Sequence, residues 1–272
     1  MTIEQANTEQ AGIQQESQVY RLACLEVRGG NERAAYAAEL PGLDGWVWCR
    51  PLRPSRRGGD LYYISACGHG VVARVVLADV SGHGAVVGDA AVRLRDDLRK
   101  NVELWDQSML IRQLNDDFLA GARGTQFATA FVASYYSETG ELLFTNAGHT
   151  PPLWYRTATR KWSFLDDSTP LSKEIVDLPL GVIAGTSYSQ TAVQLEAGDL
   201  LLLYTDGISE ASDESGSQLG FARLLSIAEN LPVDSPVAAG KALVAAIGRF
   251  SGGVPPTDDQ TVVVLQRRAN PT

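Results

Sequence analysis

Short apolar runs bounded by turn residues recur along the chain, and this pattern predicts β-strands. The runs cover residues 46–48, 61–66, 71–78, 127–136, 141–145, 153–155, 200–204 and 262–265. A glycine-containing turn at 67–70 separates two of these runs, so residues 60–79 are predicted to form an antiparallel hairpin. Asp60 begins one arm of this hairpin and Asp79 ends the other, which places their carboxylates side by side.

Other segments carry apolar residues three or four positions apart, which predicts amphipathic helices. The clearest stripe consists of Val87, Ala91, Leu94, Leu98 and Val102. Ser108 is expected to cap a second helix, and two more helices are predicted near 221–229 and 237–249. Mostly antiparallel strands with helices in pairs predict an α+β fold, a central antiparallel β-sandwich flanked by pairs of α-helices.

The predicted domain covers residues 45–268, without internal repeats or linkers. Residues 1–18 are polar and are expected to form a disordered tail, and 269–272 form a second tail. The lead-in segment at 19–44 contains 19–27, which fits a strand or the start of a helix, and 34–40, which fits a weak helix that ends before Pro41. Residues 165–178 interrupt the strand pattern and are expected to be a surface excursion.

Composition narrows the class of protein. The net charge of −9 argues against nucleic acid as a partner. No apolar run approaches the roughly 18–20 residues of a membrane span, and the polar start does not resemble a secretory signal. A cytoplasmic protein without a membrane partner is therefore expected. The three cysteines, Cys24, Cys49 and Cys67, do not predict a disulfide framework.

Four aspartates lie at the ends of predicted strands. Asp79 and Asp206 each follow an apolar run, Asp258 precedes one, and Asp60 begins the hairpin arm beside Asp79. Carboxylates gathered in this way repel one another unless divalent cations hold them. Oxygen ligands without histidine or cysteine clusters favour Mg²⁺ or Mn²⁺, and two such ions can activate a bridging water toward phosphorus.

Seven ordered motifs carry a resemblance to a known family. They are GGD at 58–60, DVSGHG at 79–84, FATAFVASYY at 127–136, NAGHTPP at 146–152, LPLGV at 178–182, LYTDGISEA at 203–211 and DDQT at 258–261. With these motifs the chain resembles the metal-dependent PPM (protein phosphatase 2C-type) serine/threonine phosphatases, in particular their bacterial SpoIIE/RsbU-like branch. The resemblance covers residues 40 to 268, although Tyr63 stands where the family often has an acid.

The resemblance implies a role for each of several residues. Asp79 would bridge two metal ions, Mn²⁺ or Mg²⁺, and the backbone carbonyl of Val80 would bind one of them. Asp206 and Asp258 would complete the shell of the other ion. Asp60 would lie near the second metal, and Asp259 would be a ligand or a neighbour of one.

The same resemblance implies a reaction and a substrate. A metal-bridging hydroxide would attack the phosphorus of phosphoserine or phosphothreonine in a protein. The branch suggests a phosphorylated anti-sigma-factor antagonist in a partner-switching signalling pathway as that substrate.

Other residues have two interpretations each. His83 would donate a proton to the leaving oxygen or brace its turn, and His149 is expected to be structural. Arg56 and Arg57 would bind substrate phosphate or be solvated loop charges. Two other functions stay open, a catalytically inactive PPM-fold binding module and a nucleotide cyclase. The cyclase interpretation rests on the GGD triplet alone, because Leu61 and Tyr62 replace the acid and phenylalanine of the GG[DE]EF motif.

Overall fold

A computed structural model describes residues 18–82, 85–122, 126–165 and 177–269 of the chain. The predicted N-terminal tail lies outside the described residues, apart from Gln18. So do His83, most of the predicted excursion at 165–178, and residues 270–272.

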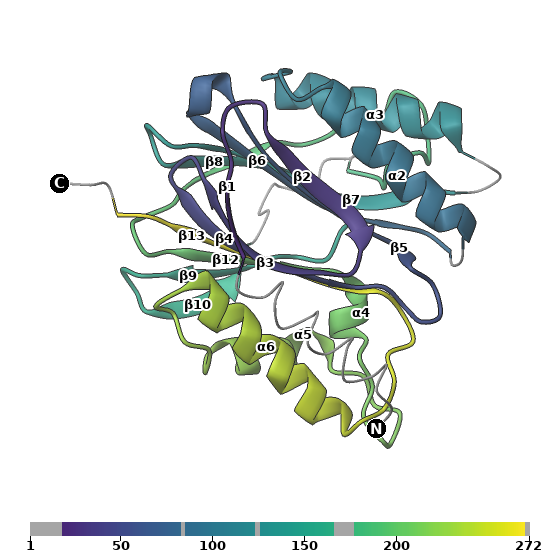
Figure 1. The fold of residues 1–272 in the computed structure, drawn as a ribbon, viewed down its shortest axis with the longest axis vertical. Helices are drawn as coiled ribbons and strands as arrows, with labels where there is room; N and C mark the ends of the chain where they lie inside the picture. Colours follow the sequence, from purple (N-terminus) through teal and green to yellow (C-terminus); the bar gives the residue numbers. More distant parts are fainter. Residues whose placement is uncertain (1–17, 83–84, 123–125, 166–176, 270–272) are drawn as a thin grey trace.

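Two β-sheets stack face to face, and helices cover the outer face of each sheet (Figure 1). The seven-stranded sheet has the order β1 (Val19–Arg21), β3 (Ala34–Leu40), β4 (Leu43–Arg50), β13 (Gln260–Arg267), β12 (Leu200–Tyr204), β9 (Leu153–Arg156) and β10 (Lys161–Phe164). The six-stranded sheet has the order β11 (Thr191–Gln194), β8 (Glu141–Ala147), β7 (Ala128–Tyr136), β6 (Val72–Val80), β5 (Arg57–Cys67) and β2 (Val27–Glu32). Among the described strands, β1 runs parallel to β3 and the other neighbouring pairs are antiparallel.

Three apolar layers hold the molecule together. One lies between the two sheets, and a second lies between the six-stranded sheet and α2 (Ala85–Lys100) and α3 (Gln107–Gly121). The third packs the seven-stranded sheet against α5 (Gly220–Ala228) and α6 (Pro236–Ser251). This arrangement confirms the predicted α+β sandwich flanked by helix pairs.

Strand β6 illustrates why the apolar runs are nearly continuous. Val75 and Leu77 pack between the sheets, whereas Val76 and Ala78 pack toward α2 and α3. A strand with both faces buried has no solvent-facing positions, so its sequence does not alternate between apolar and polar residues. The run stops at Asp79, which is the point where the candidate site begins.

Two sequence-based expectations are wrong. Residues 34–40 form strand β3 instead of a weak helix, because alternate side chains from Ala34 to Leu40 are buried and the segment pairs with β4. The alanines of this segment favour a helix locally, but tertiary pairing overrides that propensity. The cap of α3 is Asp106, whose carboxylate accepts a hydrogen bond from the Met109 amide, so Ser108 lies inside the helix.

Residues 19–44 contribute to both sheets. Residues 19–27, which fitted either a strand or the start of a helix, contain β1 and the start of β2. Strand β2 forms one edge of the six-stranded sheet by pairing with β5, and β3 joins β1 to β4 in the other sheet. The segment predicted as a lead-in therefore packs against the strand that carries Asp60.

Arg74 fixes the helix pair to the sheet. Its side chain is almost fully buried in β6, and its guanidinium donates hydrogen bonds to the carbonyl oxygens of Asn101, Val102 and Leu104. These carbonyls follow the end of α2, where backbone acceptors have no partner within the helix. The strand that ends in Asp79 thus also holds the connection between α2 and α3.

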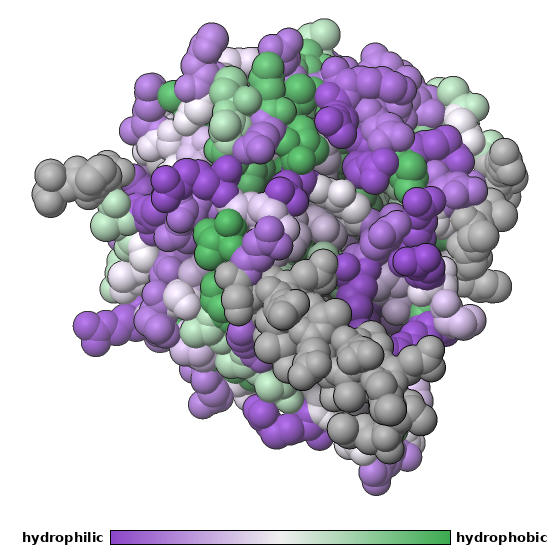
Figure 2. All heavy atoms as spheres, viewed as in Figure 1, coloured by the Kyte–Doolittle hydropathy of each residue, from purple (hydrophilic) through white to green (hydrophobic). Residues whose placement is uncertain are grey.

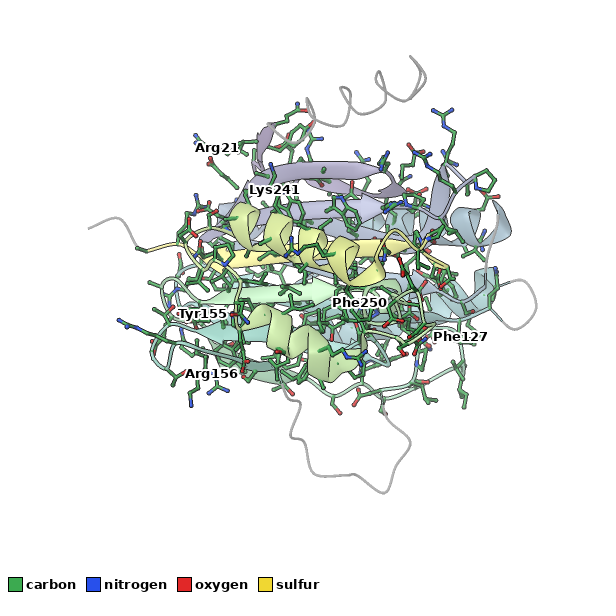
Figure 3. The ribbon with its side chains drawn as sticks, turned by 90° about the horizontal axis from the view of Figure 1, so that it is seen from below. Arg21, Phe127, Tyr155, Arg156, Lys241 and Phe250 are labelled. Atoms are coloured by element: carbon green, nitrogen blue, oxygen red, sulfur yellow. The ribbon has the colours of Figure 1, made fainter. Side chains whose placement is uncertain are left out.

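The two ends of the sandwich differ in what they carry. Phe127 and Phe250 lie toward one end, and Tyr155 and Arg156 lie toward the other (Figure 3). The Phe127 amide and carbonyl bond to Ser81, so the Phe127 end is where β6 stops and the acidic residues gather.

The face in Figure 2 is mostly hydrophilic, with small apolar patches. None of the helices in the described part of the chain is long and apolar enough to cross a membrane.

Candidate metal centre

Asp60 and Asp79 lie directly opposite each other on the paired strands β5 and β6, as the hairpin predicted. Asp60 is almost fully buried. Burial raises the pKa of the Asp60 carboxyl well above its usual value, and the charges of Asp79 and Asp259 raise it further. Burial also raises the pKa of Asp79 to about 7, with further contributions from Asp206 and then Asp258. Like charges held together in this way are costly in the absence of a cation.

Thr205 connects this pair to the other sheet. Its hydroxyl donates a hydrogen bond of 2.7 Å to Asp60 Oδ2. The hydroxyl oxygen of Thr205 in turn accepts a hydrogen bond of 3.0 Å from the Thr261 amide. Thr205 follows β12 and Thr261 lies in β13, both in the seven-stranded sheet. Asp60 therefore sits where the ends of the two sheets meet.

Asp206 follows Thr205 and starts the short helix α4 (Asp206–Ser209). Burial raises the pKa of its carboxyl, and the Glu210 carboxylate is the next cause. Gly207 permits close packing here, because a Cβ at this position would lie 1.9 Å from the Asp259 carbonyl oxygen. The Gln260 side chain donates a hydrogen bond to the Gly207 carbonyl, which fixes α4 against the start of β13.

Asp259 holds the loop between β4 and β5. Its Oδ1 accepts a hydrogen bond from the Leu52 amide and its Oδ2 accepts one from the Gly59 amide, each 2.6 Å long. A Cβ at Gly58 would lie 2.3 Å from Asp259 Oδ2, so the glycine is needed for this approach. Both carboxylate oxygens thus contact backbone amides, which favours the neighbour role of Asp259 over the ligand role.

Asp258 and Val80 complete the set of predicted ligands. Asp258 Oδ1 accepts a hydrogen bond of 2.8 Å from the Asp259 amide. The Val80 carbonyl oxygen lies close to Gly59, since a Cβ on Gly59 would be 2.8 Å from it and 3.3 Å from Asp79 Oδ1. The GGD glycines therefore allow the start of β5 to approach the end of β6 and the Asp259 carboxylate.

The donor set fits Mg²⁺ or Mn²⁺. It consists of carboxylate and carbonyl oxygens, which are the ligands that these hard cations prefer. The raised pKa values of Asp60, Asp79 and Asp206 are typical of carboxylates crowded together in a cation-binding site. Among the described residues, however, no three carboxylate, histidine or cysteine side chains converge closely enough to hold one ion as they stand. Coordination of a shared ion would require these carboxylates to rotate toward one another.

The other predicted site residues have different surroundings. Arg57 Nε forms an ion pair of 3.0 Å with Glu32 on β2, and both side chains are more than half exposed. Arg56 is exposed in the loop directly before β5, which begins at Arg57. His149 is buried in the 146–152 turn, with Nδ1 within 2.9 Å of Thr129 Oγ1, in keeping with a structural role.

Sequence reasoning missed three contributors to the site, Thr205, Glu210 and the loop-holding role of Asp259. Thr205 and Glu210 both lie within the LYTDGISEA motif, so the motif contained them without indicating their contacts. Glu210 adds negative charge close to Asp206 and Asp79. Threonine gives no compositional signal for a buried hydrogen bond, and only the fold reveals it.

Comparisons with known proteins agree with this architecture. A curated relative, phosphoserine phosphatase RsbU of Bacillus subtilis (strain 168), is 26% identical over 210 residues, which cover 75% of this chain and 58% of RsbU. The crystal structure of the RsbU and RsbW domains of Rv1364c from Mycobacterium tuberculosis superposes with a TM-score of 0.71 at 22% identity, over 92% of this chain and 64% of that chain. RsbX in complex with magnesium superposes with a TM-score of 0.63 at 14% identity, over 85% of this chain and 98% of that one.

The chain thus spans about three fifths of RsbU and of the Rv1364c structure. Residues 69–268 match the family described as Stage II sporulation protein E (SpoIIE). That segment is most of the chain, and it contains Asp79, Asp206 and Asp258 together with β6, β12 and β13. The chain therefore belongs to the SpoIIE family.

Proposed function

We propose that this protein is a Mg²⁺- or Mn²⁺-dependent protein serine/threonine phosphatase that uses two or more ions. The observation that carries the proposal is the pairing of Asp60 with Asp79 across β5 and β6, beside Asp206 and Asp258 from the other sheet. The name of the relative RsbU, a phosphoserine phosphatase, supports the same activity. The magnesium in the RsbX structure supports the choice of cation.

Each residue would then have a distinct task. Asp79 and the Val80 carbonyl would hold ions at the end of β6, and Asp206 at the start of α4 and Asp258 before β13 would hold them from the other side. When bound, Mg²⁺ or Mn²⁺ acidifies a water and neutralises charge on phosphoryl oxygens. Thr205 keeps the Asp60 carboxylate oriented by its hydrogen bond, and Asp259 keeps the β4–β5 loop against the acids.

The proposed substrate is a phosphorylated protein, and an anti-sigma-factor antagonist in a bacterial partner-switching pathway is the specific candidate. The presence of RsbU and RsbW domains together in the Rv1364c structure supports such a pathway. A cytoplasmic location, and the absence of nucleic-acid or membrane partners, stay predictions from the sequence.

One observation favours a second candidate, a PPM-fold regulatory module with little or no activity. The described acidic side chains do not converge on a single ion as they stand. An inactive module would retain the fold and the acidic cluster without turnover.

A phosphatase assay separates the two candidates. Hydrolysis of para-nitrophenyl phosphate and of a phosphoserine protein would be measured with Mn²⁺, with Mg²⁺ and with a chelator. We expect metal-dependent turnover that Asp79→Asn abolishes, with the matched change Asp89→Asn on the exposed face of α2 as the control. Metal-independent turnover, or full activity in Asp79→Asn, would contradict the proposed site. No turnover with any metal would favour the regulatory module.

A further inference from the structure

A pocket of about 310 Å³ lies between α4, α6 and the end of β4. Its walls come from β4, α4, α6 and the loop before β13, and they include Trp48, Arg50, Ile208, Gly248, Pro255 and Pro256. Most of these side chains are apolar, and Arg50 is the charged residue among the lining residues of the described chain. The loop after α6, which supplies Pro255 and Pro256, runs past α4 to β13 at the right of Figure 1.

The pocket shares a wall with the candidate metal centre. Arg50 pairs with Gln260 across β4 and β13, and Gln260 directly follows Asp259. Gln260 also lines the pocket and donates its side-chain hydrogen bond to Gly207, the residue after Asp206. A chain segment in this pocket would therefore lie next to a group bound at the acids.

Arg50 lines the pocket, and two further arginines lie near it. Arg33 precedes Ala34, which pairs with Cys49, the residue before Arg50, and Arg53 follows Arg50 by three residues. Burial lowers the pKa of Arg50, and the neighbouring charges of Arg33 and Arg53 lower it further. Arg33 and Arg53 are exposed, and Arg50 is partly buried. Within the residues that the structure describes, none of the three has a carboxylate within ion-pair distance, in contrast to Arg57, which pairs with Glu32.

Such a cluster is unfavourable in the free protein. Like charges repel, and the chain carries 32 acidic residues that could have neutralised them. An anionic partner would turn this repulsion into attraction, and the apolar walls of the pocket would add the burial of an apolar side chain. Inorganic phosphate has no apolar group to place against these walls, whereas a peptide can present an acidic and an apolar side chain together.

We propose that Arg33, Arg50 and Arg53, together with this pocket, bind an acidic segment of the phosphoprotein substrate that inserts one apolar side chain. This inference rests on the proposed function and adds a recognition site to it. The phosphorylated residue would lie at the acids, and the neighbouring acidic segment would lie along the arginines. The arginines would also offset the repulsion between an acidic substrate and the carboxylate cluster.

The test measures binding of a peptide without phosphate, so its outcome does not depend on hydrolysis. The probe is a fluorescein-labelled peptide with one leucine flanked by four acidic residues, titrated with the full chain in Mg²⁺ at low salt. We expect saturable binding that weakens as salt is added, and at least tenfold weaker binding after Arg33→Ala with Arg53→Ala. Arg99→Ala with Arg112→Ala removes two exposed arginines from α2 and α3 and should leave the affinity unchanged.

The pocket is tested separately at Gly248, where a Cβ would meet no atom within 4 Å. Gly248→Leu should fill the pocket and weaken binding of the leucine peptide at least fivefold, whereas Gly248→Ala should not. Replacing the peptide leucine with serine should reproduce the loss in the unmodified protein. Circular dichroism and thermal melting establish that each variant is folded.

Several outcomes would overturn the inference. These are no saturable binding of the probe, equal losses in the two arginine double variants, or an unchanged affinity in Arg33→Ala with Arg53→Ala. Tighter binding of a short oligonucleotide, lost in Arg33→Ala with Arg53→Ala, would assign the cluster to a nucleic acid instead. If metal-dependent hydrolysis is present but the probe does not bind, the proposed function stands and this recognition site does not.

Discussion

The Thr205 hydroxyl donates a hydrogen bond of 2.7 Å to Asp60 Oδ2, although 145 residues separate the two in the chain. The bond joins the start of β5 in one sheet to the end of β12 in the other, and both residues are almost fully buried. It is thus a direct polar link between the two sheets at the end of the sandwich that carries the acids.

Thr205→Val should destabilise the protein by about 1–3 kcal/mol, because Asp60 would lose a donor and the Thr261 amide would lose an acceptor. Urea denaturation in the presence of a chelator measures this change without a contribution from bound metal. Thr205→Ser retains the hydroxyl and should lose less stability. Equal stability of the valine and serine variants would show that the bond contributes little.

Asp259→Asn should loosen the β4–β5 loop, because an amide oxygen can replace only one of the two carboxylate acceptors. We expect faster hydrogen exchange at the Leu52 or Gly59 amide and a loss of about 1–3 kcal/mol in stability. Hydrogen exchange followed by NMR resolves the two amides.

Asp258→Asn is the matched control for the loop, and it should reduce metal affinity without freeing the amides of Leu52 and Gly59. Metal affinity can be followed by the shift of the melting temperature with added Mn²⁺, because an ion bound only by the folded state stabilises it. If Asp259→Asn lowers metal affinity as strongly as Asp258→Asn does, and both amides stay protected from hydrogen exchange, Asp259 is a metal ligand and does not hold the loop.

Two glycines of α6 should respond oppositely to alanine. A Cβ at Gly240 would lie 2.0 Å from Cε3 of Trp46, so Gly240→Ala should cost about 1–3 kcal/mol through overpacking. Gly248 has open space, and Gly248→Ala should stabilise the helix by about 0.5–1 kcal/mol. Thermal and urea unfolding of both variants measure the difference. A stabilising effect at Gly240 would mean that α6 moves easily relative to β4.

His149 should make stability depend on pH in acid. Burial lowers its pKa from 6.5 to about 4, so between these values the unfolded chain binds more protons than the folded one. The stability present at neutral pH should therefore fall as the pH drops from 6.5 toward 4, by up to about 3 kcal/mol from this group.

The carboxylates with raised pKa values act in the opposite direction, so the comparison must be made with His149→Asn. Asparagine can keep a hydrogen bond to Thr129 and does not titrate. The difference in unfolding free energy between the protein and this variant should change across pH 4 to 6.5 and be constant above it. A constant difference across the whole range would show that the pKa of His149 is the same in the folded and the unfolded protein.

Local patterns in the sequence determined much of the fold. The apolar stripe from Val87 to Val102 predicted α2, because residues three and four apart share one face of a helix. The turn at 67–70 set the register of β5 and β6, and this register alone placed Asp60 opposite Asp79. In both cases the determining interactions lie between residues close in sequence.

Tertiary structure decided the segments whose local preferences were weak or misleading. Ala34–Leu40 is rich in alanine, which favours a helix, and it becomes a strand only because β4 and β1 pair with its two edges. Ser108 and Asp106 both have side chains that can cap a helix, and only the structure shows that α3 begins at Gln107 with Asp106 as its cap.

The same holds for the candidate site. The sequence identified acids at strand ends, since a carboxylate after an apolar run is costly to bury unless a cation or a hydrogen-bond donor compensates its charge. It did not reveal that Asp259 bonds Leu52, 207 residues away, or that Thr205 bonds Asp60. It also did not reveal that Arg33 lies beside Arg50, which lines a pocket. These contacts join segments that are far apart in the chain. The pairing of the strands and the packing of the sheets, which no local pattern encodes, determine which side chains meet.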